Sequence, residues 1–126
     1  MKLLLDTCVL LWWLNNSDRL GTKIINTINN SNNQAYVSSA SIWEIYIKQA
    51  AGKLTIDGNL IGTLETLDIK PLPIMLEHGK IAAELPSIHR DPFDRMLIAQ
   101  ASAEKMTIVT ADRRIQQYPV STLEVR

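Results

Sequence analysis

The sequence lacks several features that mark particular classes of protein. It has one cysteine, Cys8, so a disulfide within the chain is impossible. Its longest apolar stretch, Cys8 to Leu14, is far shorter than the roughly 20 residues that cross a bilayer. It begins Met-Lys-Leu-Leu-Leu-Asp, without the pattern of a secretory signal. We therefore expect a cytoplasmic protein that does not span a membrane.

The sequence also lacks net charge. Its 13 lysines and arginines balance 13 aspartates and glutamates, which excludes the broad basic field of a protein that coats nucleic acid. A local basic rim remains compatible with this balance. With 126 residues, 46% of them hydrophobic, the chain is long enough for one core and short for two. We expect a single domain over residues 1–126.

Short apolar runs alternate with helical patterns along the chain. The runs at 2–6, 35–38 and 106–110 indicate strands buried on both faces, and 68–72 and 120–123 are weaker strand candidates. Apolar residues recur at helical spacing in between, over 20–28, 42–49, 60–67, 75–85 and 93–100. This alternation predicts a three-layer α/β/α sandwich with a mostly parallel sheet of four to five strands.

Four acidic residues fall where the expected strands end or their neighbouring helices begin. Asp6 closes the first strand and Asp112 follows the late one, whereas Glu44 and Asp94 lie in first turns of helices. Functional residues of a parallel sheet collect at its carboxyl edge, so these acids are expected to converge. Such a cluster needs cations, and an all-oxygen ligand set favours Mg²⁺ or Mn²⁺ over zinc. It therefore points to phosphodiester chemistry.

Each acid also has a structural interpretation. Asp6 and Asp112 are placed to cap following helices, a role that contributes about 1 kcal/mol each. Glu44 fits a capping box that starts at Ser41, and it can pair with Lys48 four residues later. Capping explains each acid singly, but it does not explain why all of them fall at one edge of the sheet.

The segment His-Arg-Asp-Pro-Phe-Asp-Arg at 89–95 contains two acids with different expected roles. Asp91 precedes Pro92 and is placed to cap the helix, because proline is favoured at the first helical position. Asp94, three residues on, is the better metal ligand. His89 is expected to be a solvated loop residue, so no catalytic histidine is predicted.

Four segments, in order along the chain, resemble the PIN-domain ribonucleases, and in particular the VapC-type toxins of bacterial toxin–antitoxin pairs. They are MKLLLDTCVLLWWL, SSASIWEIYIKQAAGKL, HRDPFDRMLIAQA and TIVTADRRI. The resemblance implies a metal-dependent endoribonuclease that uses Mg²⁺ or Mn²⁺ to hydrolyse RNA. It implies that Asp6, Glu44, Asp94 and Asp112 form the metal and catalytic site, with Asp91 as an auxiliary ligand or a cap.

Basic residues flank the expected acidic cleft and are placed either to grip RNA phosphates or to neutralise the acids. They are Lys48, Arg90, Arg95, Arg113 and Arg114. The apolar run Leu10 to Leu14, which includes Trp12 and Trp13, is expected to pack or form an interface rather than stack on bases. Cys8 is expected to be a small buried hydrophobe.

The resemblance also implies partners. A cognate antitoxin is expected to lie across the groove and direct a basic side chain at the carboxylates, and a symmetric homodimer is expected. One alternative is a non-catalytic α/β binding module whose acids are helix caps. Another is a receiver-like domain phosphorylated on aspartate. The second alternative requires a lysine near the end of the last strand, where Thr110, Asp112 and arginines stand instead.

Overall fold

The computed structural model describes residues 1–125, and its centre is one five-stranded parallel sheet. The strands lie in the order β3-β2-β1-β4-β5, and every neighbouring pair is parallel. Their bounds are β1 Lys2–Leu5, β2 Gln34–Ser38, β3 Lys70–Leu72, β4 Thr107–Thr110 and β5 Thr122–Glu124. The expected parallel α/β fold is confirmed, including the two weaker strands, which form the sheet edges.

The helices connect the strands on both sides of the sheet. Their bounds are α1 Thr7–Leu14, α2 Gly21–Asn29, α3 Ser39–Ala50, α4 Leu60–Thr66, α5 Leu76–Glu84 and α6 Pro92–Glu104, and a short 3-10 helix η1 covers Ile115–Gln117. No helix within residues 1–125 is long and apolar enough to span a membrane.

Asp112 was expected to cap a following helix. The element that follows it is the short helix η1, whose N-cap residue is Arg114, so Asp112 does not cap a helix.

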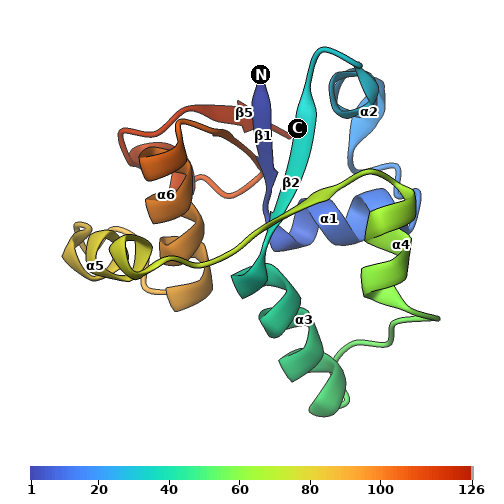
Figure 1. The fold of residues 1–126 in the computed structure, drawn as a ribbon, viewed down its shortest axis with the longest axis horizontal. Coiled ribbons are helices and arrows are strands. Elements are labelled where there is room, and N and C mark those ends of the chain that lie inside the picture. Colours follow the sequence, from blue (N-terminus) through green and yellow to red (C-terminus); the bar gives the residue numbers. More distant parts are fainter. Residues whose placement is uncertain (126) are drawn as a thin grey trace.

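Alternation along β1 divides the core into two clusters. Leu3 and Leu5 pack with residues of α1, α2 and α4, whereas Leu4, on the opposite face, packs with residues of α6. Figure 1 shows the resulting layers, with α5 and α6 on one side of the sheet and α1, α2 and α4 on the other. This is the expected three-layer arrangement.

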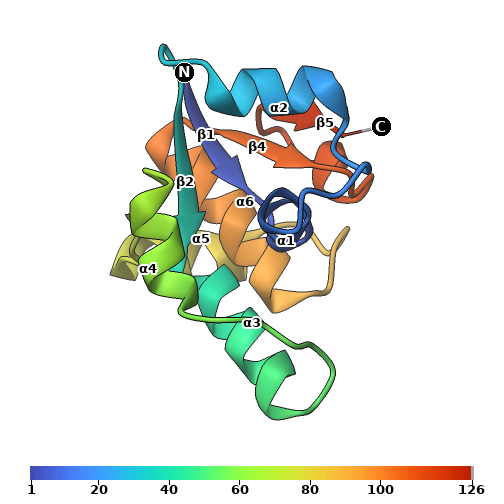
Figure 2. The same cartoon turned by 90° about the vertical axis from the view of Figure 1, so that its right-hand side faces the viewer.

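The carboxyl ends of β1 and β2 lead directly into helices. Asp6 separates β1 from α1, and Ser38 ends β2 and caps α3. Figures 1 and 2 show both strands pointing toward α3, which extends beyond the edge of the sheet. The Asp6 backbone N–H donates to the Val109 carbonyl of β4 (3.1 Å), so β1 and β4 end at the same level. The acidic residues are carried by this edge.

Candidate active site

Asp6 is both a helix cap and a buried member of an acidic cluster. Its Oδ1 accepts the backbone N–H of Val9 at 2.8 Å, which begins α1. Burial raises the pKa of Asp6 to about 6, although hydrogen bonds from Thr110 and Val9 lower it. The charges of Asp112 and Glu44 raise it further, so both carboxylates lie near enough to repel that of Asp6.

Glu44 is buried and has a specific partner on each carboxylate oxygen. The Thr7 hydroxyl lies 2.7 Å from Oε1, and Lys48 Nζ lies 2.9 Å from Oε2. The expected pair between Glu44 and Lys48 is therefore present. The hydrogen bond that the Lys48 ammonium group donates to Glu44 raises the pKa of Lys48. Thr7 lies just after Asp6, so this contact ties α3 to the end of β1.

The expected capping box of α3 is wrong. The helix begins at Ser39, and the hydroxyl of Ser38 accepts the N–H of Ala40 at 3.0 Å. Ser41 lies inside the helix, where its hydroxyl contacts Thr7 at 3.0 Å. Because β2 passes into α3 without a loop, the helix starts earlier than its sequence pattern indicates, and Glu44 lies in the second turn rather than the first.

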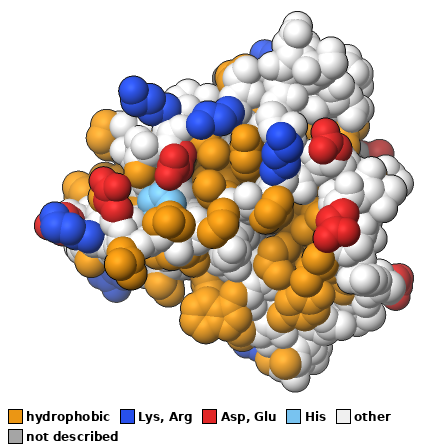
Figure 3. Space-filling view, viewed as in Figure 1, with side chains coloured by type: hydrophobic (Ala, Val, Ile, Leu, Met, Phe, Trp, Pro, Cys, Tyr) orange, Lys and Arg blue, Asp and Glu red, His pale blue; other side chains and the backbone are white. Residues whose placement is uncertain are grey.

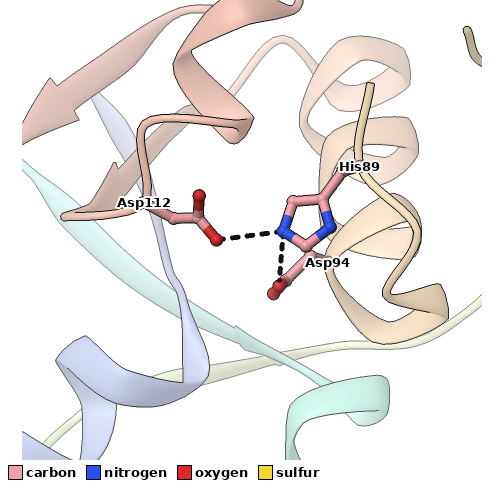
Figure 4. A group of neighbouring side chains, drawn as sticks. All are labelled: His89, Asp94 and Asp112. Carbon is pink, nitrogen blue, oxygen red and sulfur yellow. Dashed lines mark hydrogen bonds and ion pairs between the residues drawn. The ribbon is translucent and has the colours of Figure 1, made fainter. Parts of the chain in front are cut away.

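Asp94 and Asp112 are bridged by a histidine (Figure 4). His89 Nε2 lies 3.0 Å from Asp94 Oδ2 and 2.9 Å from Asp112 Oδ2, and one ligand atom of each residue lies within 4.8 Å of the others. His89 is 3% exposed. The expectation of a solvated loop histidine is therefore wrong, because the residue is buried between two carboxylates that the sequence separates.

Contacts on three sides hold His89 in place. Its backbone N–H donates to the Tyr118 hydroxyl at 2.8 Å, and its carbonyl accepts from the Arg95 guanidinium at 3.1 Å. Its Nδ1 accepts the backbone N–H of Asp91 at 3.2 Å. Only the proximity of His89 to the acids of its own segment could have suggested this role, because Tyr118 is distant in sequence and carries no motif.

Asp91 caps α6, as expected. Its Oδ1 accepts the N–H groups of Phe93 (2.8 Å) and Asp94 (3.3 Å). Burial raises the pKa of Asp94 to about 7, and the charge of Asp91 acts in the same direction, whereas His89 lowers it. A carboxyl group with a pKa near 7 exchanges a proton for a cation near neutral pH.

The pKa of Asp112 is lowered, whereas that of Asp94 is raised. Partial burial acts to raise its pKa, but hydrogen bonds from His89 and from the backbone N–H of Arg114 outweigh this effect and hold the pKa below its usual range. Asp112 therefore stays charged, whereas Asp6 and Asp94 are inclined to hold protons in the absence of a cation.

The basic residues expected to flank the acidic cleft differ in their contacts. The Arg95 guanidinium donates to four backbone carbonyls at 2.8 to 3.1 Å, so it holds the chain before α6 and is not available at the surface. These carbonyls belong to Ala82, Leu85, Pro86 and His89. Arg90, Arg113 and Arg114 are exposed, and Arg114 Nε lies 3.9 Å from Asp112. Lys48 pairs with Glu44 but is half-exposed.

The apolar residues that follow Asp6 differ in their surroundings. Leu10 is fully buried, and residues 11–14 pack against the core, while Trp13 and Leu14 line a surface hollow of about 640 Å³ with residues of α2 and α4. Trp12 packs, with the Arg19 guanidinium 5.6 Å from its ring centre. Cys8 is exposed, so the expectation of a buried thiol is wrong.

Most of the large exposed apolar side chains lie elsewhere. Trp43 on α3 is 63% exposed and packs edge-on against Phe93 with ring centres 5.5 Å apart. Met75 and Leu76, where the linker from β3 enters α5, are also exposed. Figure 3 shows hydrophobic side chains gathered across the face of the molecule that this linker crosses.

The residues of the cluster fit a hard divalent cation. Asp6, Glu44, Asp94 and Asp112 offer carboxylate oxygens, which Mg²⁺ and Mn²⁺ prefer. Burial is the main cause of the raised pKa values of Asp6 and Asp94, and repulsion from neighbouring carboxylates adds to it. A bound cation would relieve that repulsion.

Comparison with known proteins places the fold. The sequence matches the family described as PIN domain over residues 3–120. The structure is similar to VapBC2 from Rickettsia felis bound to a promoter DNA fragment (TM-score 0.75, 16% identity, 98% of each chain covered). It is also similar to DNA-bound VapBC from Salmonella typhimurium (0.69, 16%, 100% of this chain and 99% of that chain) and to a toxin-antitoxin complex from Klebsiella pneumoniae (0.68, 11%, 98% and 97%). No curated protein sequence matches the chain.

Proposed function

The chain belongs to the PIN domain family, and from this premise we propose that it is a metal-dependent endoribonuclease, the toxin of a toxin–antitoxin pair. The observation that carries the proposal is the acidic cluster at the carboxyl edge of the parallel sheet. Its members come from separate segments; they are Asp6, Glu44, Asp94 and Asp112. The charges of Glu44 and Asp112 act to raise the pKa of Asp6, and those of Asp6 and Glu44 act to raise the pKa of Asp94. A set of helix caps alone does not require this convergence.

We propose Asp6 and Asp94 as direct ligands of Mg²⁺ or Mn²⁺, with Glu44 and Asp112 completing the shell directly or through water. The ion would supply the Lewis acidity that lowers the pKa of a water and stabilises charge on phosphoryl oxygens. Thr7 orients Glu44 by its 2.7 Å hydrogen bond. The backbone N–H of Arg114 orients Asp112 at 2.8 Å. Asp91, whose oxygen caps α6, sets the position of Asp94.

The substrate is RNA in this proposal, held through its phosphates. Lys48, Arg90 and Arg113 have exposed charges near residues of the acidic cluster, and basic side chains fix the register of a nucleic-acid backbone. Arg95 is left out of this role because its guanidinium is occupied by backbone carbonyls. Its contribution is to hold the loop that carries His89.

The proposed partners are a cognate antitoxin and a second copy of the chain. Solved structures with the same fold contain VapBC pairs and a toxin-antitoxin complex. The exposed apolar side chains of Trp43, Met75 and Leu76 offer surface that a partner would cover. An antitoxin that directs a basic side chain at the carboxylates would neutralise the cluster and block substrate entry.

The test is cleavage of total cellular RNA by the purified, antitoxin-free protein in Mg²⁺, in Mn²⁺ and in EDTA, with the fragment ends mapped. Asp94→Asn should abolish metal-dependent cleavage, whereas Asp57→Asn, the same substitution at an exposed position of the loop before α4, should leave it unchanged. Circular dichroism checks that both variants fold. A folded wild-type protein that cleaves none of several RNA classes would favour the binding-module alternative.

A further inference from the structure

His89 Nε2 contacts two carboxylates at once, and the hydrogen-bond pattern of the ring defines what it offers them. Nδ1 accepts the backbone N–H of Asp91 at 3.2 Å, so this nitrogen carries a lone pair and no proton. The proton of a neutral ring therefore lies on Nε2, which is 3.0 Å from Asp94 Oδ2 and 2.9 Å from Asp112 Oδ2. The ring presents a shared N–H donor to both acids (Figure 4).

The chain contains a matched histidine away from the cluster. His78 is 2% exposed, its Nδ1 accepts the backbone N–H of Met75 at 2.9 Å, and its Nε2 lies 3.1 Å from Glu104. Both histidines therefore accept a backbone N–H at Nδ1 and contact carboxylate at Nε2. His78 contacts one partly exposed carboxylate, whereas His89 lies between two. Only at His89 does the donor lie between two carboxylates.

The setting of His89 is rigid. The Tyr118 hydroxyl accepts its N–H and donates to the Pro86 carbonyl at 2.6 Å, while Arg95 binds its carbonyl and that of Pro86. A side chain fixed at backbone and ring is held at one location, and here that location is between Asp94 and Asp112.

We propose that His89 is a positioning residue that takes the place of the cation in the metal-free protein: its Nε2–H links Asp94 and Asp112 and is exchanged for the ion on binding. This inference rests on the proposed metal site. A ligand role for the ring would need a lone pair on Nε2 and a proton on Nδ1, where it would face the N–H of Asp91. His89 is therefore a competitor of the cation and lowers the affinity of the site.

The experiment measures Mn²⁺ binding to metal-free protein by isothermal titration calorimetry, together with the melting temperature in EDTA and in Mn²⁺. In His89→Asn, the shorter amide can accept the N–H of Asp91 as an Asx-turn but does not reach the carboxylates. Mn²⁺ should bind about tenfold more tightly, and the melting temperature in EDTA should fall. In His89→Gln, the amide N–H reaches the position of Nε2, so Mn²⁺ affinity should stay within about threefold of wild type.

His78→Asn is the matched control and should lower the melting temperature without changing Mn²⁺ affinity. Equal or weaker Mn²⁺ binding by His89→Asn overturns the inference, and so does tighter binding by His78→Asn, since that would indicate general loosening. If wild-type protein binds no Mn²⁺, or Asp94→Asn binds it equally well, the proposed metal site itself is wrong.

A second measurement needs no variant. Long-range ¹H–¹⁵N correlation spectra of wild-type protein should show the proton of both histidines on Nε2 in EDTA. Saturating Mg²⁺ should shift the Nε2 resonance of His89 and leave that of His78 unchanged. An Nε2 resonance of His89 that does not respond to bound Mg²⁺ overturns the proposed exchange.

Discussion

At the scale of single residues, each carboxylate of the cluster is distinguished by the donor it receives. Asp6 has a backbone N–H at its cap, Glu44 has Lys48, and Asp112 has His89 and the N–H of Arg114. Asp94 depends on His89 and lies close to the charge of Asp91. Burial outweighs the hydrogen bonds that Asp6 receives and the charge of His89 beside Asp94, so the pKa values of these two acids rise.

The raised pKa values predict how stability depends on pH. The pKa of Asp6 is raised from 3.8 to about 6 and that of Asp94 from 3.8 to about 7, so the folded protein holds these protons more tightly than the unfolded chain. Both groups stabilise the fold at low pH, and this contribution is lost as pH rises from about 4 to about 7. In EDTA, Asp94→Asn should therefore melt higher than wild type at pH 8, and the difference should shrink at pH 5.

Differential scanning fluorimetry between pH 5 and 8 measures this difference directly. Asp57→Asn, at an exposed position, should give a constant offset from wild type. A gap between wild type and Asp94→Asn that is independent of pH would mean that Asp94 does not titrate in this range.

Thr7 leads to a second prediction at this scale. Its hydroxyl is buried and lies 2.7 Å from Glu44 and 3.0 Å from Ser41. Thr7→Val keeps the shape but removes the hydroxyl from the buried Glu44 and Ser41, so stability should fall by about 1 to 3 kcal/mol. Thr7→Ser should lose less because it restores the donor. Urea unfolding measures both, and a larger loss for Thr7→Ser than for Thr7→Val would show that the methyl group, not the hydroxyl, matters.

The acids could be predicted from sequence because each follows or precedes an element whose end is recognisable. Asp6 comes directly after β1 and Asp112 comes two residues after the end of β4, and parallel topology brings such positions together. His89 could not be predicted in this way. Its burial depends on Tyr118 and Arg95, and single-sequence patterns do not encode contacts between a loop and side chains of other elements.

At the scale of elements, an irregular connection is held in place by side chains of its neighbours. The connection between α5 and α6 has no regular structure, yet side chains from α6 and from the end of η1 bind its backbone. Three of the four carbonyls that Arg95 binds lie on it, and Tyr118 binds both Pro86 and His89. Backbone groups that would be satisfied within a helix are satisfied here by side chains.

Tyr118→Phe tests this constraint. The variant leaves the buried N–H of His89 without its partner and removes one of the two donors to the Pro86 carbonyl, so stability should fall by about 1 to 3 kcal/mol. The loop that carries His89 should become less protected in amide hydrogen exchange, while β1 and β2 remain protected. Uniform loss of protection would show that Tyr118 supports the whole core instead.

The predicted elements agree with the structure where burial determines the sequence pattern. They disagree where the connection between two elements determines where a helix begins. Strands buried on both faces produce the apolar runs that end at Asp6 and Thr110, and these were predicted to within a residue or two. The start of α3 was predicted too late because Ser38 serves at once as the end of β2 and the cap of the helix. Such sharing leaves no loop signature in the sequence.

At the scale of the whole molecule, a buried polar network adds to the apolar contacts between α6 and the sheet. Gln100 of α6 is fully buried, its Oε1 accepts from the Ser38 hydroxyl at 2.5 Å, and its Nε2 donates to the Pro73 carbonyl at 3.1 Å. It therefore ties α6 to the end of β2 and to the segment after β3. The sheet edge that carries Asp6 is braced by contacts distinct from those of the acids.

This separation predicts that stability and metal binding respond independently. Gln100→Leu is similar in volume but leaves the Ser38 hydroxyl and the Pro73 carbonyl unpaired, so stability should fall by about 1 to 3 kcal/mol. Mn²⁺ affinity, measured well below the melting temperature, should match that of wild type because the donors to Asp94 and Asp112 are unchanged. Weaker Mn²⁺ binding by folded Gln100→Leu would mean instead that the position of α6, and not only its first turn, sets the geometry of the acids.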